Sequence, residues 1–283
     1  MVYGDALLLL RIIIVASFLL YTCQLDMKTR RVPNKVWLIM IGVGTPFVFY
    51  DLASQGTSYL IQLVVSVVLI YSVMAFIFYM GHYIGGVFGG ADAKAIIVLS
   101  YIFPAYPQMN LLGISLPLFG TPFGIEPFDI LAYQGISAST VLMFLLISLY
   151  SSFAFTSFFN GLIIFILIPL LILIYNLRNL NLKEVRENPI LIFFSYRSKI
   201  SDLKGKHVRL IHEFHEDKGK ILRKFRFSGV KIDDEMIERL ERWKEKGKIG
   251  EEVWVQALLP FMIAITLGYL AAFVFGNLMF AII

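Results

Sequence analysis

Acidic residues are scarce in the apolar part of this chain, and two of them occupy positions from which their carboxyl groups could act together. Asp26 closes the first apolar run and Asp92 opens the fourth. If successive runs cross a membrane in alternating directions, both carboxyl groups lie at the same end of the helices. An ionisable side chain at membrane depth is costly and is a functional hypothesis by default. We therefore predict that Asp26 and Asp92 form a catalytic pair.

A pair of carboxyl groups has a well-defined chemistry. Two carboxylates a few ångströms apart cannot both ionise cheaply, so they hold one proton between them. The ionised member takes a proton from a water that attacks a peptide carbonyl, and the protonated member donates to the carbonyl oxygen. This hydrolysis requires no metal and no cofactor, and we predict neither. Because the titrations are coupled, the roles of base and acid are not divided between the residues. Taken singly, each aspartate is also explained as a helix cap or a solvated helix end.

A glycine-rich run precedes Asp92. Residues 81–90 include five glycines, which disfavour a regular helix and let another chain approach the backbone closely. A protease holds its substrate extended, and a glycine-rich edge could supply backbone hydrogen bonds for that purpose. The alternatives are a tight interfacial loop or a surface of small residues for helix packing.

Composition indicates a membrane protein. The 283 residues are 58% hydrophobic and 16% charged, whereas soluble domains carry about 25% charged residues. The apolar residues form long runs, and the single cysteine excludes an internal disulfide and a four-cysteine zinc module. We predict a mainly α fold, a polytopic bundle of six transmembrane helices. The candidate spans are residues 6–25, 36–51, 58–80, 92–104, 139–176 and 254–282.

The distribution of charge indicates the orientation of these spans. If the N-terminus is outside and residues 139–176 cross once, the inner segments contain 24 of the 25 lysines and arginines. The exception is Arg11, inside the first span. Lysine and arginine mark cytoplasmic loops, and this explanation of the net charge of +5 is favoured over nucleic-acid binding. It places both chain ends outside and both aspartates at the cytoplasmic face of the cell membrane.

Residues 178–252 differ in kind, because charged residues are frequent there. The apolar and polar pattern predicts short strands at residues 207–214 and 220–227, with a third at 189–195. Residues 233–246 have helical spacing, and either aspartate at their start can cap the helix. We predict a small cytosolic α+β insertion before the last span. The predicted organisation is a membrane domain at 1–177, the insertion at 178–252 and the last span at 253–283.

Two short segments resemble a known signature. Gly89-Gly90-Ala91-Asp92 is similar to the GxGD motif of intramembrane aspartyl proteases, with Ala91 in place of the second glycine. The segment 26–34, in which basic residues and a Val-Pro-Asn turn follow Asp26, resembles the other half of the prepilin peptidase signature. Asp92-Ala93-Lys94 resembles the archaeal branch. Together these segments make the chain similar to an archaeal prepilin or preflagellin peptidase.

The resemblance implies a function and a substrate. Prepilin-type peptidases remove basic leader peptides from archaellin and pilin precursors at the cytoplasmic face, so such precursors and the lipid bilayer are the expected partners. Nucleic acid is not expected, and the oligomeric state stays open. The residues expected to bind substrate or shape the site are Gly89, Gly90, Ala91, Arg30, Arg31, Asn34 and Lys94. For the two arginines, anchoring to anionic lipid head groups is the alternative.

Other functions are compatible with two acidic residues in a membrane protein. A presenilin-like or signal-peptide-peptidase-like protease also uses two aspartates, but it usually has tyrosine before the first, where this chain has Leu25. A transporter could bind protons or cations at Asp26 and Asp92, and would be expected to show an internal repeat, which we do not find. A non-catalytic assembly scaffold would tolerate the loss of Asp92.

Overall fold

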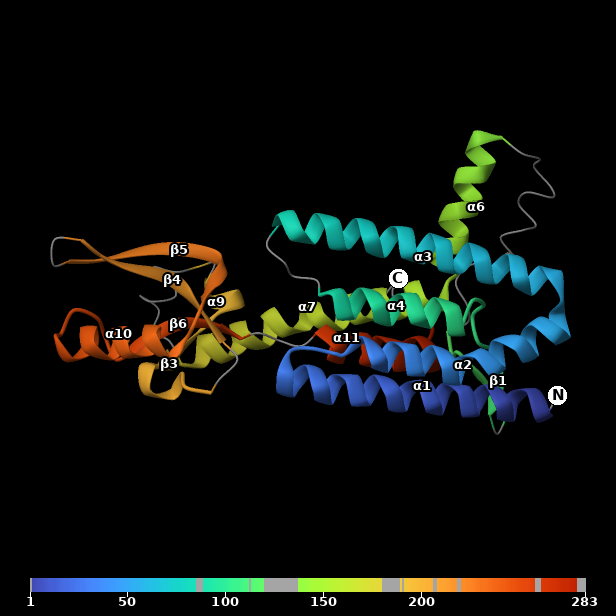
Figure 1. The fold of residues 1–283 in the computed structure, drawn as a ribbon, viewed down its shortest axis with the longest axis horizontal. Helices are drawn as coiled ribbons and strands as arrows, with labels where there is room; N and C mark the ends of the chain where they lie inside the picture. The colour runs from blue at the N-terminus through green and yellow to red at the C-terminus, as the bar shows by residue number, and fades with distance from the viewer. Residues whose placement is uncertain are drawn as a thin grey trace. The chain divides into compact units, whose positions relative to one another are not determined.

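The computed structural model describes residues 2–84, 89–111, 113–119, 137–179, 189, 191–205, 208–217, 220–257 and 261–278 (Figure 1). The chain forms two compact units. We call Met1–Phe165 with Pro260–Ile283 the helical unit, and Ile166–Leu259 the sheet unit. The fold is mainly helical, with a small β-sheet region near the C-terminus, as the composition and patterning predicted.

The helical unit consists of long apolar helices that end at residues unsuited to a helix. Pro33 precedes α2, and Gly56, with a φ of 68°, follows it in a conformation that favours glycine. Pro104 stands just beyond α4. The elements that lie wholly or partly in this unit are α1 (Val2–Thr29), α2 (Asn34–Gln55), α3 (Thr57–Ile84), α4 (Gly90–Ile102), β1 (Met109–Leu111), β2 (Ile114–Leu116), α6 (Ala138–Tyr150), α7 (Phe153–Asn179) and α11 (Phe261–Val274).

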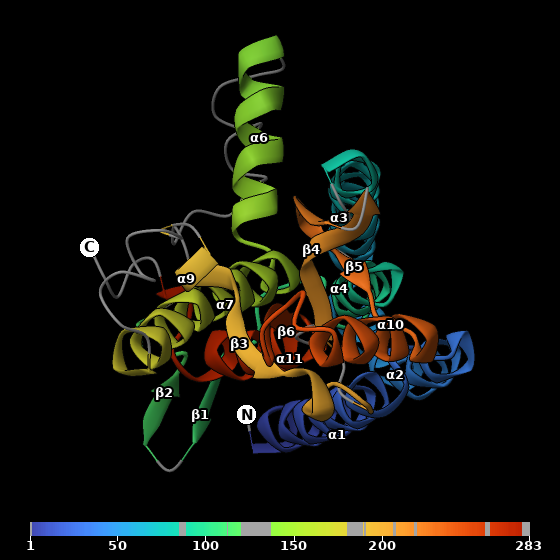
Figure 2. The same cartoon turned by 90° about the vertical axis from the view of Figure 1, so that its left-hand side faces the viewer.

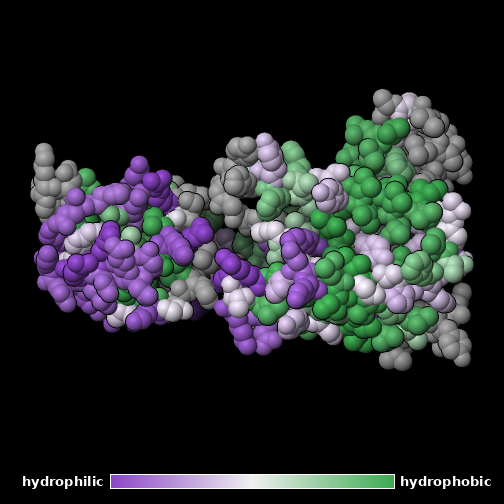
Figure 3. All heavy atoms as spheres, viewed as in Figure 1, coloured by the Kyte–Doolittle hydropathy of each residue, from purple (hydrophilic) through white to green (hydrophobic). Residues whose placement is uncertain are grey.

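Four helices of the described chain are long and apolar enough to cross a membrane. They are α1 from Asp5, α2, α3 as far as Met80, and α7. Apolar side chains also cover much of the visible surface of this unit (Figure 3). The six spans that we predicted are not confirmed. The helices in the fourth and sixth predicted spans, α4 and α11, have 13 and 14 residues, whereas a crossing takes about 20.

The predicted fifth span, residues 139–176, is divided between two helices. Ser151 and Ser152 separate α6 from α7. In Figures 1 and 2, α6 turns away from the other helices of the unit. Its 13 residues are too few for a crossing. Of the two helices, only α7 has the length of a span.

The helix α4 occupies the interior of the helical unit. Eight of its 13 residues are buried, including Asp92, and it packs against α2, α3 and α11. A Cβ atom on Gly44 of α2 would lie 2.8 Å from Ile102, so α2 and the end of α4 are in close contact. A helix that is apolar on all sides is typical of such a buried position.

The sheet unit forms an antiparallel sheet in the order β3-β6-β4-β5. Helix α10 shares its apolar core through Leu240 and Trp243. Figure 2 shows the strands and α10 of this unit. The elements are α9 (Leu191–Phe194), β3 (Tyr196–Lys199), the 3₁₀ turn Ile200–Asp202, β4 (Val208–Asp217), β5 (Lys220–Lys231), α10 (Asp234–Glu245) and β6 (Glu252–Ala257).

Most secondary-structure predictions for the sheet unit are confirmed. The two central predictions correspond to β4 and β5, and Asp233 caps α10 by accepting from the Met236 amide at 2.8 Å. The predicted strand at 189–195 is wrong, because residues 191–194 form α9. The Asn176 amide group donates to the Ile192 and Ser195 carbonyls, which stabilises this turn of helix.

The predicted start of the last span also differs from the structure. Residues assigned to that span form β6, which pairs with β3 and β4. The apolar alternation of Val253 and Val255 serves the core of the sheet unit. Helix α11 begins only at Phe261. The domain limits at 177 and 252 stay a prediction.

Candidate active site

Asp92 is held in the first turn of α4. Its side chain is 6% exposed, and its Oδ2 atom accepts a hydrogen bond from the Gly89 amide at 2.9 Å. The first amides of a helix have no partner within the helix, so a carboxylate in this turn serves as a cap and faces the positive end of the helix dipole. The local sequence therefore positions the carboxyl group before any tertiary contact is made.

Asp26 lies in the last turn of α1, where the helix dipole does not favour a negative charge. It is partly buried. Arg30 acts electrostatically on its carboxyl group, and so, more weakly, does the backbone amide of Met262 in the first turn of α11. A helix N-terminus provides free N–H groups for an anion. The start of α11 and Arg30 thus supply what the end of α1 lacks.

The fold brings these two carboxyl groups to the same end of the helical unit. The Asp92 carboxyl group is influenced first by burial, then by the Gly89 amide and then by the charge of Asp26. α1 and α4 carry them, and α11 packs against both helices. Among the described residues, no group of three histidine, cysteine or acidic side chains has the arrangement of metal ligands.

The structure also brings two of the predicted site-shaping residues together. The Lys94 Nζ atom donates to the Asn34 Oδ1 atom at 2.7 Å, and so joins α4 to the start of α2. Arg30 has a φ of 55°, an uncommon conformation for a residue with a side chain. It directly follows α1 and is partly buried, in electrostatic contact with Asp26.

The remaining predicted residues are less closely tied to the two aspartates. Arg31 is exposed. Ala91 packs against the core of the helical unit. A Cβ atom on Gly90 would meet the Phe78 ring at 3.8 Å, an ordinary contact. Part of the glycine-rich run, residues 85–88, lies outside the described residues.

The sequence did not predict three features of the helical unit, of which two are near Asp26 and one is far from both aspartates. The Met262 amide belongs to the backbone, so no residue type could have revealed it. Cys23, one turn before Asp26, lies 3.0 Å from the Thr266 hydroxyl group, and these residues join α1 to α11. Arg11 is paired with Asp51 at 2.6 Å. An arginine inside an apolar run was the available signal for that pair.

Two regions of the chain match models of known protein families. Residues 13–125 match the type IV leader peptidase family, and residues 187–278 match the archaeal Peptidase A24 C-terminus, type II. The two matches span most of the chain and define a peptidase with membrane-spanning helices. The chain thus has a region of the type IV leader peptidase family and the C-terminal region of the archaeal A24 peptidases.

The chain is also similar over almost its full length to three preflagellin peptidases. It is 24% identical to that of Methanococcus maripaludis, with 94% of each chain covered. It is 23% identical to that of Methanocaldococcus jannaschii, with 95% of each chain covered. It is 23% identical to that of Methanococcus voltae, with 91% of each chain covered.

Proposed function

We propose that the protein is an aspartyl endopeptidase that removes the basic leader peptide from archaellin or pilin-like precursors. The observation that supports this most directly is the position of Asp26 at the end of α1 and of Asp92 in the first turn of α4, close enough for the charge of Asp26 to act on Asp92, in a chain that matches the leader peptidase family. The names of the similar preflagellin peptidases support the class of substrate. The proposed site is at the cytoplasmic face of the cell membrane, because basic residues cluster just after Asp26.

In the proposed reaction, a water molecule lies between the two carboxyl groups and the scissile peptide bond. The ionised carboxylate takes a proton from the water as its oxygen attacks the carbonyl carbon, and the protonated carboxyl group donates to the carbonyl oxygen. The tetrahedral intermediate then collapses. The C–N bond breaks, the new amine receives a proton, and a carboxylic acid and an amine are released. The pair ends with one proton, as it began.

Side chains around the pair have proposed roles in holding this geometry. Arg30 compensates the charge of Asp26, while Gly89 donates its amide to Asp92. The Lys94–Asn34 hydrogen bond holds α4 and α2 together beside the pair. Arg31, which is exposed, is available to contact lipid head groups or the substrate.

The test is cleavage of a defined precursor by the purified protein in proteoliposomes. An archaellin precursor with its basic leader should become shorter, and mass spectrometry should place the cut before the apolar helix. The same archaellin without its leader is the control and should stay intact. A cut inside the apolar helix would favour a presenilin-like protease instead. Cation flux without any cleavage would favour a transporter, and either result contradicts the proposal.

Gly89 and Gly90 offer a matched test of how Asp92 is positioned. A Cβ atom on Gly89 would lie 3.0 Å from the Asp92 Oδ2 atom, whereas on Gly90 the nearest atom would be at 3.8 Å. Gly89→Ala should displace the carboxyl group and lower kcat by about 10- to 100-fold, because misplacement by about 1 Å has effects of that size. Gly90→Ala should lose clearly less. Equal losses in initial-rate assays would contradict the proposed role of Gly89.

A further inference from the structure

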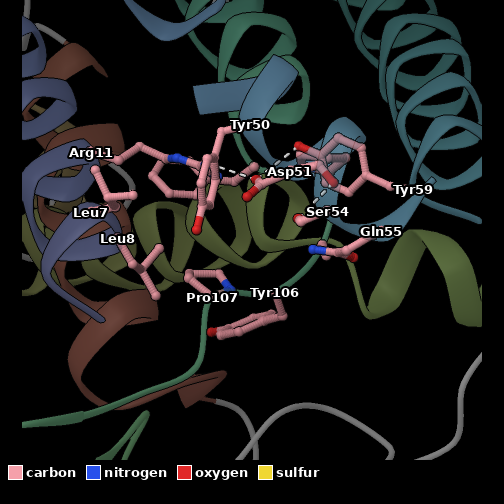
Figure 4. Close-up of a pocket in the computed structure, with 13 residues that line it drawn as sticks. Leu7, Leu8, Arg11, Tyr50, Asp51, Ser54, Gln55, Tyr59, Tyr106 and Pro107 are labelled. Atoms are coloured by element: carbon pink, nitrogen blue, oxygen red, sulfur yellow. Dashed lines mark hydrogen bonds and ion pairs between the residues drawn. The ribbon is translucent and has the colours of Figure 1, made fainter. Parts of the chain in front are cut away.

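A partly buried ion pair joins α1 and α2 at the end of the helical unit away from Asp26 and Asp92. The Arg11 Nη2 atom of α1 lies 2.6 Å from the Asp51 Oδ2 atom of α2. The Tyr59 hydroxyl group of α3 donates to the same oxygen at 3.1 Å. Figure 4 shows the three side chains converging beside a cavity of about 300 Å³.

Arg11 extends this network to the end of α4. Its Nη1 atom donates to the Ile102 carbonyl at 3.4 Å, and its Nη2 atom also donates to the Phe47 carbonyl at 3.1 Å. The guanidinium group lies 5.6 Å from the centre of the Phe103 ring, within range of a cation–π interaction. One side chain therefore connects α1, α2 and α4, and Asp51 adds α3.

The energetics favour a role in geometry over a role in net stability. Arg11 is 8% exposed, and removing a charge from water costs several kcal/mol before any pairing. Well-packed apolar residues in place of a buried ion pair often give equal or greater stability. Apolar contacts are non-directional, whereas the hydrogen bonds of Arg11 have defined donors and acceptors. The ion pair therefore contributes a fixed distance and angle between the helices that it joins.

The distance and angle set by the ion pair also determine the positions of the two aspartates, because α1 and α4 carry them. Arg11 and Asp26 share α1 and are about 22 Å apart along it, while Ile102 and Asp92 share α4 and are about 15 Å apart, at 1.5 Å per residue. A tilt of either helix by about 5° about the ion pair would move the distant carboxyl group by about 1–2 Å over these lengths. A displacement of that size is sufficient to impair catalysis.

We propose that Arg11, Asp51 and Tyr59 form a positioning clamp that sets the separation of the Asp26 and Asp92 carboxyl groups. The clamp residues do not touch the substrate; they act through α1 and α4. This inference rests on the proposed function, but its main readout, a distance between helices, does not require activity.

The distance is measured with two spin labels near the aspartates. Cysteines replace Met27 on α1 and Lys94 on α4, both of which are exposed, in a Cys23→Ala background that removes the single native cysteine. These changes remove the Lys94–Asn34 and Cys23–Thr266 contacts, so every variant is compared with the labelled protein that carries the same three changes and retains Arg11. Double electron–electron resonance in proteoliposomes gives the distance distribution. Arg11→Met should shift its maximum by about 2 Å or broaden it, as expected from the lengths of α1 and α4. Tyr50→Phe, at the rim of the cavity, should leave the distribution unchanged.

Kinetics of the unlabelled protein separate positioning from mere stabilisation. Arg11→Met should lower kcat by about 10- to 100-fold with KM changed by less than about twofold, because a displaced catalytic pair affects the chemical step more than binding. The charge-exchanged Arg11→Asp/Asp51→Arg variant should recover part of kcat and the original distances.

Two results would contradict the proposal that Arg11, Asp51 and Tyr59 position the aspartates. A folded, monodisperse Arg11→Met protein with the original distance distribution and kcat overturns it, as does a changed distance with unchanged kcat. If Arg11→Met does not fold, Tyr59→Phe decides, because it removes only the hydroxyl donor to Asp51. If the wild-type protein cleaves no precursor, the proposed function fails, while the distance measurement still tests the clamp.

Discussion

If the proposed mechanism holds, Asp26→Asn and Asp92→Asn should each lower the rate of leader removal by about 10³-fold or more, because each removes a group that transfers a proton in the proposed reaction. Asparagine has nearly the shape of aspartate but neither ionises nor donates as an acid. At position 92 it can still accept the Gly89 amide, since asparagine also caps helices. The loss should therefore come from chemistry and not from unfolding.

The double variant makes this prediction sharper. If the carboxyl groups act as one unit, Asp26→Asn/Asp92→Asn should be no slower than either single variant, because effects of residues that act together are strongly non-additive. Initial rates of product formation measure this. Asp5→Asn, the same change in the first turn of α1, is the matched control and should retain the wild-type rate. A single variant within tenfold of wild type would remove that aspartate from the mechanism.

Gly268→Ala should destabilise the helical unit more than Gly89→Ala or Gly90→Ala. A Cβ atom on Gly268 would lie 2.1 Å from the Ser157 carbonyl oxygen and 2.5 Å from the Gly161 nitrogen. Both atoms belong to the backbone of α7, so no side chain can rotate away and the two helices must separate. Small residues at such a contact let helix backbones approach closely. We expect a loss of about 3 kcal/mol, at the upper end of the usual overpacking range.

Gly42→Ala is the matched control for this prediction. Gly42 is exposed in α2, and its added Cβ would meet no atom within 4 Å. Alanine is favoured over glycine in a helix by about 1 kcal/mol, so this variant should be as stable as wild type or more so. Thermal unfolding in detergent compares the two. The Gly268→Ala protein that does fold should also cleave precursor more slowly, because α11 carries the Met262 amide that acts on Asp26. Equal unfolding temperatures for the two variants would contradict the prediction.

Different parts of the chain position the two aspartates. This difference explains why the sequence predicts the surroundings of Asp92 better than those of Asp26. Asp92 is oriented by its own helix, through an amide three residues away, and a cap of this kind is a local property of sequence. Asp26 depends on Met262, more than 230 residues later in the chain. No spacing rule connects such distant segments, because their contact exists only after the helices pack.

The same division applies to the elements of the fold. The long apolar runs predicted α1, α2 and α3, because a helix satisfies its backbone hydrogen bonds within its own segment in an apolar medium. The run at 139–176 was predicted as one span and is divided between α6 and α7. The alternation at 207–214 and 220–227 predicted β4 and β5. The apolar residues of β6 were instead assigned to a span, since a short apolar run looks alike in a buried strand and in a helix. Its pairing with β3 and β4 decided the matter.

By itself the sequence indicated a membrane protein and predicted two acidic residues at corresponding ends of its apolar runs, because charge is expensive at that depth and hydropathy is a property of the residues alone. Only the tertiary structure decided which groups meet those residues: the Met262 amide at Asp26, and the Arg11–Asp51 pair at the other end of the helices. Such contacts depend on how each helix is rotated and how closely it approaches its neighbours. Side-chain packing throughout the helical unit fixes both.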